Sequence, residues 1–285
     1  MQNSYILPVS VVIATLGNKS LINTIECLNS TKYKPKEILV CIPLELKNNV
    51  ELQNKFKNVI IHYTSKFGQV YQRSEGFKIA SEKYVLQLDD DIIFTGLNLK
   101  YLLSDLNKLD DKSAIGPQYF NITKNIFCYT NFYGLKKIES YLIEYFLGGS
   151  KFGKKRMGTI SKSGQNFNFD INYMKQDIVQ VEWLAGGCVL HLKKNLITYD
   201  FYPFSGKAYC EDLIHSFLLT KNSIKLFLTK NVICNLEDTY EPIGKLEILK
   251  EKKARNYLLI LINGSYTKWI MRRIYWSLKF KLWYK

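Results

Sequence analysis

The chain has 285 residues, of which 47% are hydrophobic and 14% aromatic, and its formal net charge is +15. This length and apolar content allow a substantial core, in one large domain or in two fused halves. A basic protein can bind nucleic acid, an anionic membrane or phosphorylated ligands, and net charge alone does not choose among them.

Membrane-spanning, secreted and zinc-dependent proteins are disfavoured by the residue pattern. No apolar stretch approaches the roughly 18 to 20 residues that a membrane span needs. No basic segment precedes the apolar run 5–7, which Pro8 interrupts, so we expect no signal peptide. The cysteines form no CxxC pair and several lie in apolar strings, which favours buried thiols in a reducing cytoplasm. They are Cys27, Cys41, Cys128, Cys188, Cys210 and Cys234.

The first hundred residues alternate between strand and helix patterns. A β-rich run at 9–14 predicts a strand buried on both faces, and a helix follows over about 21–28. Further strands are predicted at 37–42, 59–63 and 84–88, with a helix over about 69–80. This alternation is typical of an α/β protein with a parallel sheet, whose strand ends meet at one edge.

After residue 91 the pattern becomes less regular. Helices are predicted around 97–109 and 136–146, the second with Ile138, Leu142, Tyr145 and Phe146 as its apolar face. Residues 148–168 are rich in Gly, Ser, Lys and Asn and predict a loop of the kind that covers binding sites. Strands are predicted in the last part of the domain, at 179–183, 187–192 and 224–234.

Three adjacent carboxylates, Asp89, Asp90 and Asp91, end the apolar run 84–88. Ligands of α/β sheets bind at the carboxyl ends of strands. Because alternate residues of an extended segment point to one side, Asp89 and Asp91 can converge on one point. Such oxygen ligands suit Mg²⁺ or Mn²⁺, and the embedding of the triplet between apolar segments favours this interpretation over a solvated acidic turn.

Four stretches in this order resemble the family 2 glycosyltransferases, which have the GT-A fold. The likeness covers about residues 7–240, and each stretch alone is a weak signal. The stretches are the opening strand 11–14 with Thr15, the helix start with Gly68, Gln69, Gln72, Arg73 and Gly76, the segment 88–91, and Trp183 to Gly187 followed by Glu211 and Asp212.

The resemblance implies a single Rossmann-like, mixed and mainly parallel sheet flanked by helices. It divides the chain into a GT-A domain at 1–240, with a nucleotide-sugar half at 1–100 and an acceptor half at 101–240. A basic, aromatic helical tail at 241–285 follows. It also implies an inverting, metal-dependent enzyme of bacterial surface-glycan synthesis.

The resemblance further implies how the donor is held. Asp91 would bind the divalent ion that bridges the two phosphates, with Asp89 on the ribose or the ion. The donor would be a nucleoside diphosphate sugar, with UDP or dTDP favoured. The implied nucleotide-sugar site consists of Thr15, Arg73, Asp89, Asp90, Gly186 and Gly187.

The pair Glu211-Asp212 resembles the family's acidic pair, whose second member is the general base. Asp212 would take the proton of the acceptor hydroxyl as that oxygen attacks the anomeric carbon. The alternative is two acids that only interact with a helix dipole. Trp183 would stack on an acceptor sugar, or it is a buried strand tryptophan.

Two positions depart from the family pattern. The segment 40–44 lacks the aspartate that usually contacts the base, and no acid occurs until Glu45. The segment 234–237 lacks the late histidine: either Asn235 or Glu237 takes over its role, or the role is absent.

The tail from 252 to 285 contains nine Lys or Arg and no acid. On a helix, its tryptophans and its aliphatic residues occupy opposite faces, so one face can pack on the domain and the other can enter an anionic bilayer. The equal alternative is a packed helix with a solvated basic edge. The two groups are Trp269, Trp276, Phe280 and Trp283 against Met271, Ile274, Leu278 and Leu282.

The leading hypothesis is a cytoplasmic glycosyltransferase, peripheral on the inner membrane face, that extends a glycan or lipid-linked oligosaccharide. One alternative is a sugar-nucleotide pyrophosphorylase-like enzyme, against which the single glycine in the loop 15–19 argues. The other is a basic nucleic-acid-binding protein, which needs an aromatic basic face and which the acidic triplet opposes. We therefore expect no nucleic-acid partner.

Overall fold

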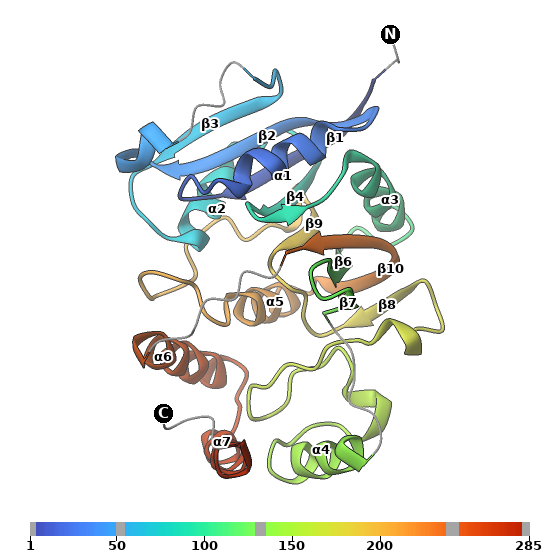
Figure 1. The fold of residues 1–285 in the computed structure, drawn as a ribbon, viewed down its shortest axis with the longest axis vertical. Coiled ribbons are helices and arrows are strands. Elements are labelled where there is room, and N and C mark those ends of the chain that lie inside the picture. The colour runs from blue at the N-terminus through green and yellow to red at the C-terminus, as the bar shows by residue number, and fades with distance from the viewer. Residues whose placement is uncertain (1–3, 50–54, 129–134, 238–244, 281–285) are drawn as a thin grey trace.

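A single mixed sheet forms the centre of the protein. The computed structural model describes residues 4–49, 55–128, 135–237 and 245–280. The strands follow the order β3-β2-β1-β4-β9-β6-β10-β5, with β7 paired to β6 and β8 paired to β10 (Figure 1). The prediction of a mixed sheet flanked by helices is confirmed.

The N-terminal half of the sheet is wholly parallel. β1 lies between β2 and β4, and β3 extends the sheet beyond β2. The connecting helices α1 and α2 arise where the sequence predicted them. The bounds are β1 Tyr5–Ala14, α1 Ser20–Asn29, β2 Tyr33–Pro43, the short 3-10 segment η1 Leu44–Asn49, β3 Val59–Thr64, α2 Gln69–Ile79 and β4 Tyr84–Asp89.

Helices cover both faces of this half because alternate residues of β1 point to opposite sides. Val11 and Ile13 belong to a core cluster with α1 and with α3, Gly96–Leu106. Val12 packs on the other face, toward α2. A side chain at Gly76 of α2 would come within 2.4 Å of Val12, so the glycine permits the close contact between helix and sheet.

The second half of the sheet is mostly antiparallel. β9 pairs antiparallel with both β4 and β6, whereas β6 runs parallel to β10. β6 was not predicted. The register of its pairing with β10 shifts at Pro117, between Gly116 and Gln118. The bounds are β5 Ile92–Ile93, β6 Ser113–Asn121, β7 Ile126–Phe127, β8 Ile178–Val181, β9 Cys188–Leu192 and β10 Lys225–Leu236.

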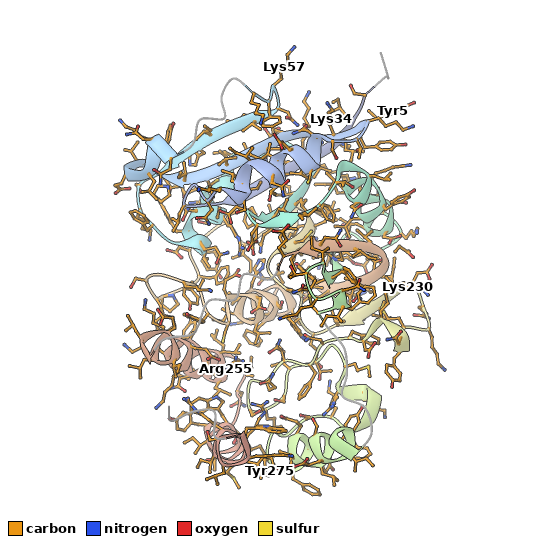
Figure 2. The ribbon with its side chains drawn as sticks, in the orientation of Figure 1. Tyr5, Lys34, Lys57, Lys230, Arg255 and Tyr275 are labelled. Atoms are coloured by element: carbon orange, nitrogen blue, oxygen red, sulfur yellow. The ribbon has the colours of Figure 1, made fainter. Side chains whose placement is uncertain are left out.

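Of the remaining helices, α5, Glu211–Lys221, packs on this half of the sheet, where Leu219 clusters with Ala114 and Leu226. It also packs against α6, Lys245–Leu261, whose Ala254 and Leu258 are fully buried with Leu213. α4, Leu135–Phe146, and α7, Tyr266–Phe280, lie together at the end farthest from β3 (Figure 1). Figure 2 shows Arg255 on α6 and Tyr275 on α7, at the opposite end from Tyr5 and Lys57.

Short 3-10 segments connect the rest of the chain. They are η2 Gly153–Arg156, η3 Ile171–Tyr173 and η4 Lys193–Asn195. Among the described residues, no helix combines the length and the apolar character needed to cross a bilayer.

Candidate functional site

The carboxyl ends of β1 and β4 meet at one edge of the sheet. Asp89 is the last residue of β4, and Asp90 lies in the turn that follows. The Asp90 carboxylate accepts hydrogen bonds from the Thr15 hydroxyl and, at 3.2 Å, from the Asn18 amide. The Thr24 hydroxyl donates to the Asp90 carbonyl oxygen at 3.0 Å. Asp90 and Thr15 therefore fasten the loop after β1 to the acidic turn.

Asp91 is the exposed member of the triplet. Although the residue reaches solvent, partial desolvation of its carboxyl, followed by the charges of Asp89 and Asp90, raises the pKa of Asp91. No side chain among the described residues donates a hydrogen bond to it. The nearby charge of Lys207 opposes the rise in pKa. A carboxylate whose charge is raised in energy by its acidic neighbours is a suitable oxygen ligand for a divalent ion.

Arg73 joins the acidic edge to the start of α5. It is 2% exposed, donates from Nη2 to Asp89 Oδ1 and lies 3.0 Å from Glu211 Oε2. Gln69 Nε2 donates to the same Asp89 oxygen at 3.2 Å. Burial opposes the charge of Arg73, but Glu211 and Asp89 together hold its pKa above the ordinary value. The structure thus pairs this arginine with two carboxylates inside the protein.

The predicted glycine pair approaches the same network. The Asp89 N–H donates to the Gly187 carbonyl oxygen at 2.8 Å, and the Gln87 amide donates to the Gly186 carbonyl oxygen. A side chain at Gly186 would come within 2.8 Å of Glu211 Oε2. One at Gly187 would lie 3.1 Å from Asp89 Oδ2. A side chain at either position would therefore press on the acids of α5 or of β4.

Asp212 lies in the first turn of α5, next to the buried Glu211. Its Oδ1 accepts a hydrogen bond from the Leu213 N–H at 2.9 Å. Burial, followed by the charge of Glu211, raises the pKa of Asp212 to about 6, although the nearby Arg255 charge opposes the rise. A carboxylate with such a pKa can accept a proton near neutral pH.

Trp183 is buried next to these residues, in a cluster with Leu213 and Ile214. Its Nε1–H donates to the Phe167 carbonyl oxygen at 3.0 Å. The indole is therefore held within the core, and the acceptor role expected of Trp183 stays a prediction.

The two segments that depart from the family pattern lie at the same edge of the sheet. Glu45, in η1 directly after β2, is exposed. In the antiparallel pairing of β10 with β5, Asn235 is opposite Ile93 and Leu236 is opposite Ile92. The segment 234–237 is therefore beside Asp91, where the predicted substitute for the late histidine would need to be.

A cavity of about 140 Å³ lies between α6, α7 and the loop around Gly164. Arg255 donates from Nη1 to the Gly164 carbonyl oxygen, and the Arg273 guanidinium lies 5.3 Å from the Trp269 ring centroid. Sequence analysis did not predict this site, because its residues come from three distant segments. The cavity is lined by Ser163, Gly164, Gln165, Glu251, Lys252, Arg255, Trp269, Arg272, Arg273 and Trp276.

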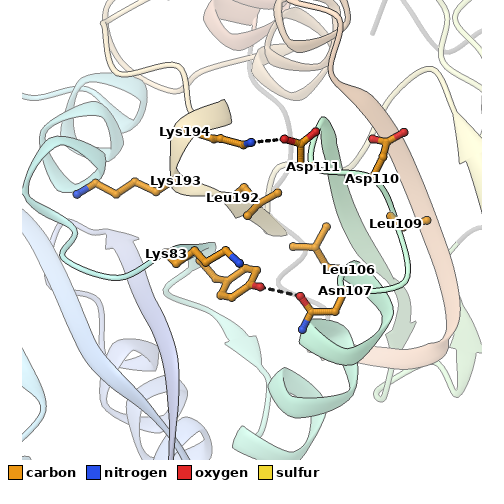
Figure 3. A pocket seen from close by; sticks show the side chains of 10 residues that line it. Lys83, Leu106, Asn107, Leu109, Asp110, Asp111, Leu192, Lys193 and Lys194 are labelled. Carbon is orange, nitrogen blue, oxygen red and sulfur yellow. Dashed lines mark hydrogen bonds and ion pairs between the residues drawn. The ribbon is translucent and has the colours of Figure 1, made fainter.

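A larger cavity of about 670 Å³ opens at the opposite edge of the sheet (Figure 3). It lies at the amino end of β4, roughly 17 Å along the strand from Asp89. Its Lys194 is paired with Asp111, and the Tyr84 hydroxyl donates to Asn107 at 2.7 Å. None of the predicted site residues lines it.

A metal ion would have few protein ligands here. Within the described parts of the chain, no group of three or more His, Cys, Asp and Glu side chains could hold an ion. Asp89 Oδ1 is bound by Arg73, which leaves Asp89 Oδ2 and the Asp91 carboxylate. One or two carboxylates completed by substrate phosphates is the usual way in which Mg²⁺ is held, so these residues fit such an ion.

The chain matches one family of known proteins. Residues 10–167, more than half of the chain, match the family profile described as Glycosyl transferase family 2. No curated protein sequence matches the chain.

Two solved structures have the same fold. GalNAc-T7 with UDP, GalNAc and Mn²⁺ aligns with a TM-score of 0.55 at 15% identity, over 95% of this chain and 57% of that one. S. aureus TarS 1–349 in complex with UDP-GlcNAc aligns with a TM-score of 0.56 at 13% identity, over 97% and 77%. At these identities the likeness shows the fold, and the predicted GT-A fold is confirmed.

Proposed function

Since this chain belongs to glycosyltransferase family 2 and is a glycosyltransferase, we propose that it inverts the anomeric centre of the sugar that it transfers. The donor is a nucleoside diphosphate sugar, and the acceptor is a hydroxyl of a glycan or lipid-linked oligosaccharide in surface polysaccharide synthesis. The observation that carries the proposal is the Arg73 network, which joins the acidic end of β4 to the start of α5, where Asp212 follows the buried Glu211.

Asp212 acts as the general base in this proposal. It accepts the proton of the acceptor hydroxyl while that oxygen forms its bond to the anomeric carbon from the face opposite the diphosphate. The bond between the anomeric carbon and the diphosphate oxygen breaks, and its electron pair leaves with the nucleoside diphosphate. A single displacement of this kind inverts the anomeric centre.

The donor diphosphate is held at the acidic edge. Asp91, together with Asp89 Oδ2, would bind Mg²⁺ or Mn²⁺. A divalent ion there offsets negative charge on the departing diphosphate. Thr15 and Asp90 hold the adjoining loop, and Gly186 and Gly187 let the backbone approach the donor.

Arg73 is a positioning residue in the proposed mechanism. Its ion pairs with Asp89 and Glu211 fix the end of β4 against the start of α5. The donor side and the base are thereby held at a constant separation. A fixed separation of the donor and the base is a major part of catalysis, because it removes the entropic cost of aligning the reactants.

The donor is proposed to be a UDP sugar or, as second choice, a dTDP sugar. The two solved structures compared above were determined with UDP or a UDP sugar, and one also with Mn²⁺. Family membership favours sugar transfer over both the pyrophosphorylase-like and the nucleic-acid-binding alternatives.

The acceptor is proposed to enter the cavity beside α7. Its tryptophans offer ring faces for sugars, and its arginines offer charge for a phosphate of a lipid-linked acceptor. Arg255 lines this cavity and also acts on the pKa of Asp212. The enzyme would then work in the cytoplasm, at the inner face of the cytoplasmic membrane.

The direct test is a panel of nucleotide sugars, with Mg²⁺ or Mn²⁺, measured by calorimetry and by donor hydrolysis. We expect one donor to bind in a metal-dependent manner, and Asp91→Ala to abolish that dependence. Asp111→Ala, which removes an exposed acid from the opposite edge, is the matched control. Equal binding by wild type and Asp91→Ala would contradict the proposed donor site.

A further inference from the structure

α4 is an amphipathic helix whose apolar face points away from the protein. Ile138 is 58% exposed and Phe146 is 64% exposed, with Leu142 and Tyr145 on the same exposed side. The buried side carries Glu144, which is 2% exposed. The sequence predicted this apolar face correctly, but the structure turns it outward, opposite to the usual arrangement of a helix on a protein core.

α7 has the same reversed arrangement. Ile274 is 53% exposed and Leu278 is 76% exposed, and Met271 lies on the same side. The opposite side of the helix carries Trp269 and Trp276, which line the cavity beside α6. In the described part of the tail, Trp269 and Trp276 therefore face the protein and the aliphatic residues face outward, whereas Leu282 and Trp283 lie outside the described residues.

Polar contacts join the two helices. Arg272 Nε donates to both Glu144 carboxylate oxygens, at 2.7 and 2.8 Å, and Trp276 Nε1 donates to Glu144 Oε1 at 3.2 Å. Lys279 and the Tyr275 hydroxyl both contact Glu139. Two ion pairs and two further hydrogen bonds thus join α4 and α7, while the exposed sides are apolar. We call these exposed sides, formed by Ile138, Leu142, Tyr145, Phe146, Met271, Ile274 and Leu278, the outer face.

The two helices that carry the outer face have a net positive charge. The two helices carry six Lys or Arg against two Glu, and α7 has no acid. Both Glu side chains are used in the ion pairs between the helices. Apolar side chains flanked by cations are the composition that binds anionic bilayer interfaces, where the apolar groups enter the acyl region and the cations meet phosphates.

We infer that the outer face of α4 and α7 is a docking surface for an anionic phospholipid bilayer. Both helices lie in the interface, and neither crosses it. A second copy of the chain is a poorer occupant, because it would bring together two pairs of helices that each carry six Lys or Arg against two Glu, so that like net charges would meet. A nucleic acid would leave the apolar groups uncovered.

This docking site extends the proposed function. The link between docking and the acceptor rests on that proposal. The inner side of α7 lines the cavity suggested for the acceptor, and its outer side would rest on lipid. The phosphate of an acceptor anchored in the same bilayer would then lie next to Arg273 and Trp269. Docking itself does not depend on the catalytic chemistry.

Vesicle flotation of the full-length protein tests the docking site. The probes are vesicles of phosphatidylcholine alone and of phosphatidylcholine with phosphatidylglycerol. We expect binding only to the anionic vesicles, weakened about tenfold by Leu142→Ser and by Leu278→Ser, since each removes one exposed leucine from the apolar contact. The control is Ile60→Ser on β3, which removes an apolar group of similar exposure (48%) at the opposite end of the molecule.

The possible results distinguish a bilayer from a second copy of the chain, and the docking proposal from the proposed catalysis. No binding of wild type to anionic vesicles, or equal loss in Ile60→Ser, would overturn the docking site. A concentration-dependent dimer that Leu142→Ser and Leu278→Ser dissociate, without vesicle binding, would assign the face to a second copy. Donor hydrolysis in vesicle-free buffer should be unchanged in both variants, so loss of docking and loss of catalysis are read separately.

Discussion

The acidic edge of the sheet and the outer face of α4 and α7 distribute polarity in opposite ways. At the edge, Arg73 is buried between Asp89 and Glu211, and aliphatic side chains fill the core on both sides of the sheet. At the far end, Glu144 is buried between two helices while leucines face outward. In the first arrangement the apolar residues of the core clusters are buried under helices. The second leaves apolar surface exposed, which indicates an external partner.

Replacing the proposed base should give the largest effect on activity. Asp212→Asn keeps the size of the side chain but cannot accept the proton, so we expect kcat for transfer to fall by about 10³-fold, while donor binding stays unchanged. Steady-state transfer and calorimetry with the donor measure these two quantities. A variant with near wild-type kcat would remove Asp212 from the mechanism.

The same substitution should stabilise the acidic edge. The pKa of Asp212 is raised from 3.8 to about 6 in the folded protein, so the folded state holds that proton more tightly. The ionised carboxylate therefore lowers stability as pH rises through this interval. Asp212→Asn should raise the free energy of unfolding at pH 8 by up to about 3 kcal/mol, and by much less at pH 4. Urea unfolding at both pH values checks the sign.

Removing the buried guanidinium of Arg73 should destabilise the acidic edge of the sheet. Arg73→Met leaves Asp89 and Glu211 without their shared partner, so we expect the free energy of unfolding to fall by about 3 to 5 kcal/mol. Lys194→Met, which removes an exposed partner of Asp111, is the control and should change stability little. Equal effects of the two substitutions would show that the Arg73 network does not hold β4 against α5.

Crowding the contact between α2 and the sheet tests the packed half. At Gly76, an added methyl group would lie 2.4 Å from Val12 and 2.7 Å from the Cys41 sulfur. Gly76→Ala should therefore lower the free energy of unfolding by about 1 to 3 kcal/mol, in spite of the better helix propensity of alanine. Lys78→Ala, on the same helix but exposed, is the comparison for chemical denaturation.

Arg255 should tune the base from the acceptor side. Its positive charge lowers the pKa of Asp212, so its removal should raise that pKa. In wild type, kcat/KM should fall as pH drops below about 6, because Asp212 becomes protonated. In Arg255→Gln this decline should begin at a higher pH. The pH profile of donor hydrolysis measures this decline. If the decline begins at the same pH in both proteins, Arg255 in the cavity does not act on the base.

The outer face should matter least for folding. Leu278→Ser should change the free energy of unfolding by no more than about 0.5 kcal/mol, since the side chain is already exposed. Leu258→Ser, on the fully buried side of α6, should cost about 3 kcal/mol or more. Thermal unfolding of the two variants compares them directly. A large loss in Leu278→Ser would mean that this face supports the fold.

The parallel half of the sheet could be predicted because its apolar runs are long and its helices are regular. β6 was missed since Gly116 and Pro117 interrupt its sequence. In the structure the pairing between β6 and β10 is irregular at this point, and Leu184 packs on Gly116, so tertiary contacts override the local signal.

The site was predictable as a set of residues and less so as a set of contacts. Asp89 to Asp91, Glu211 and Gly186 can be found by their order in the chain. No sequence pattern shows that Arg73 turns inward to two carboxylates, because spacing does not fix the direction of a side chain. For the same reason, amphipathic spacing in α4 and α7 predicts an apolar face without showing whether it faces the core or the outside.

The most direct test of the central claim separates donor binding from transfer at the acidic edge. Donor affinity with Mn²⁺ and turnover should be measured for wild type, Asp91→Ala and Asp212→Asn. We predict that Asp91→Ala loses metal-dependent donor binding, whereas Asp212→Asn binds the donor as wild type does and loses turnover. Loss of binding in both variants, or turnover retained in Asp212→Asn, would contradict the division of roles between the end of β4 and the start of α5.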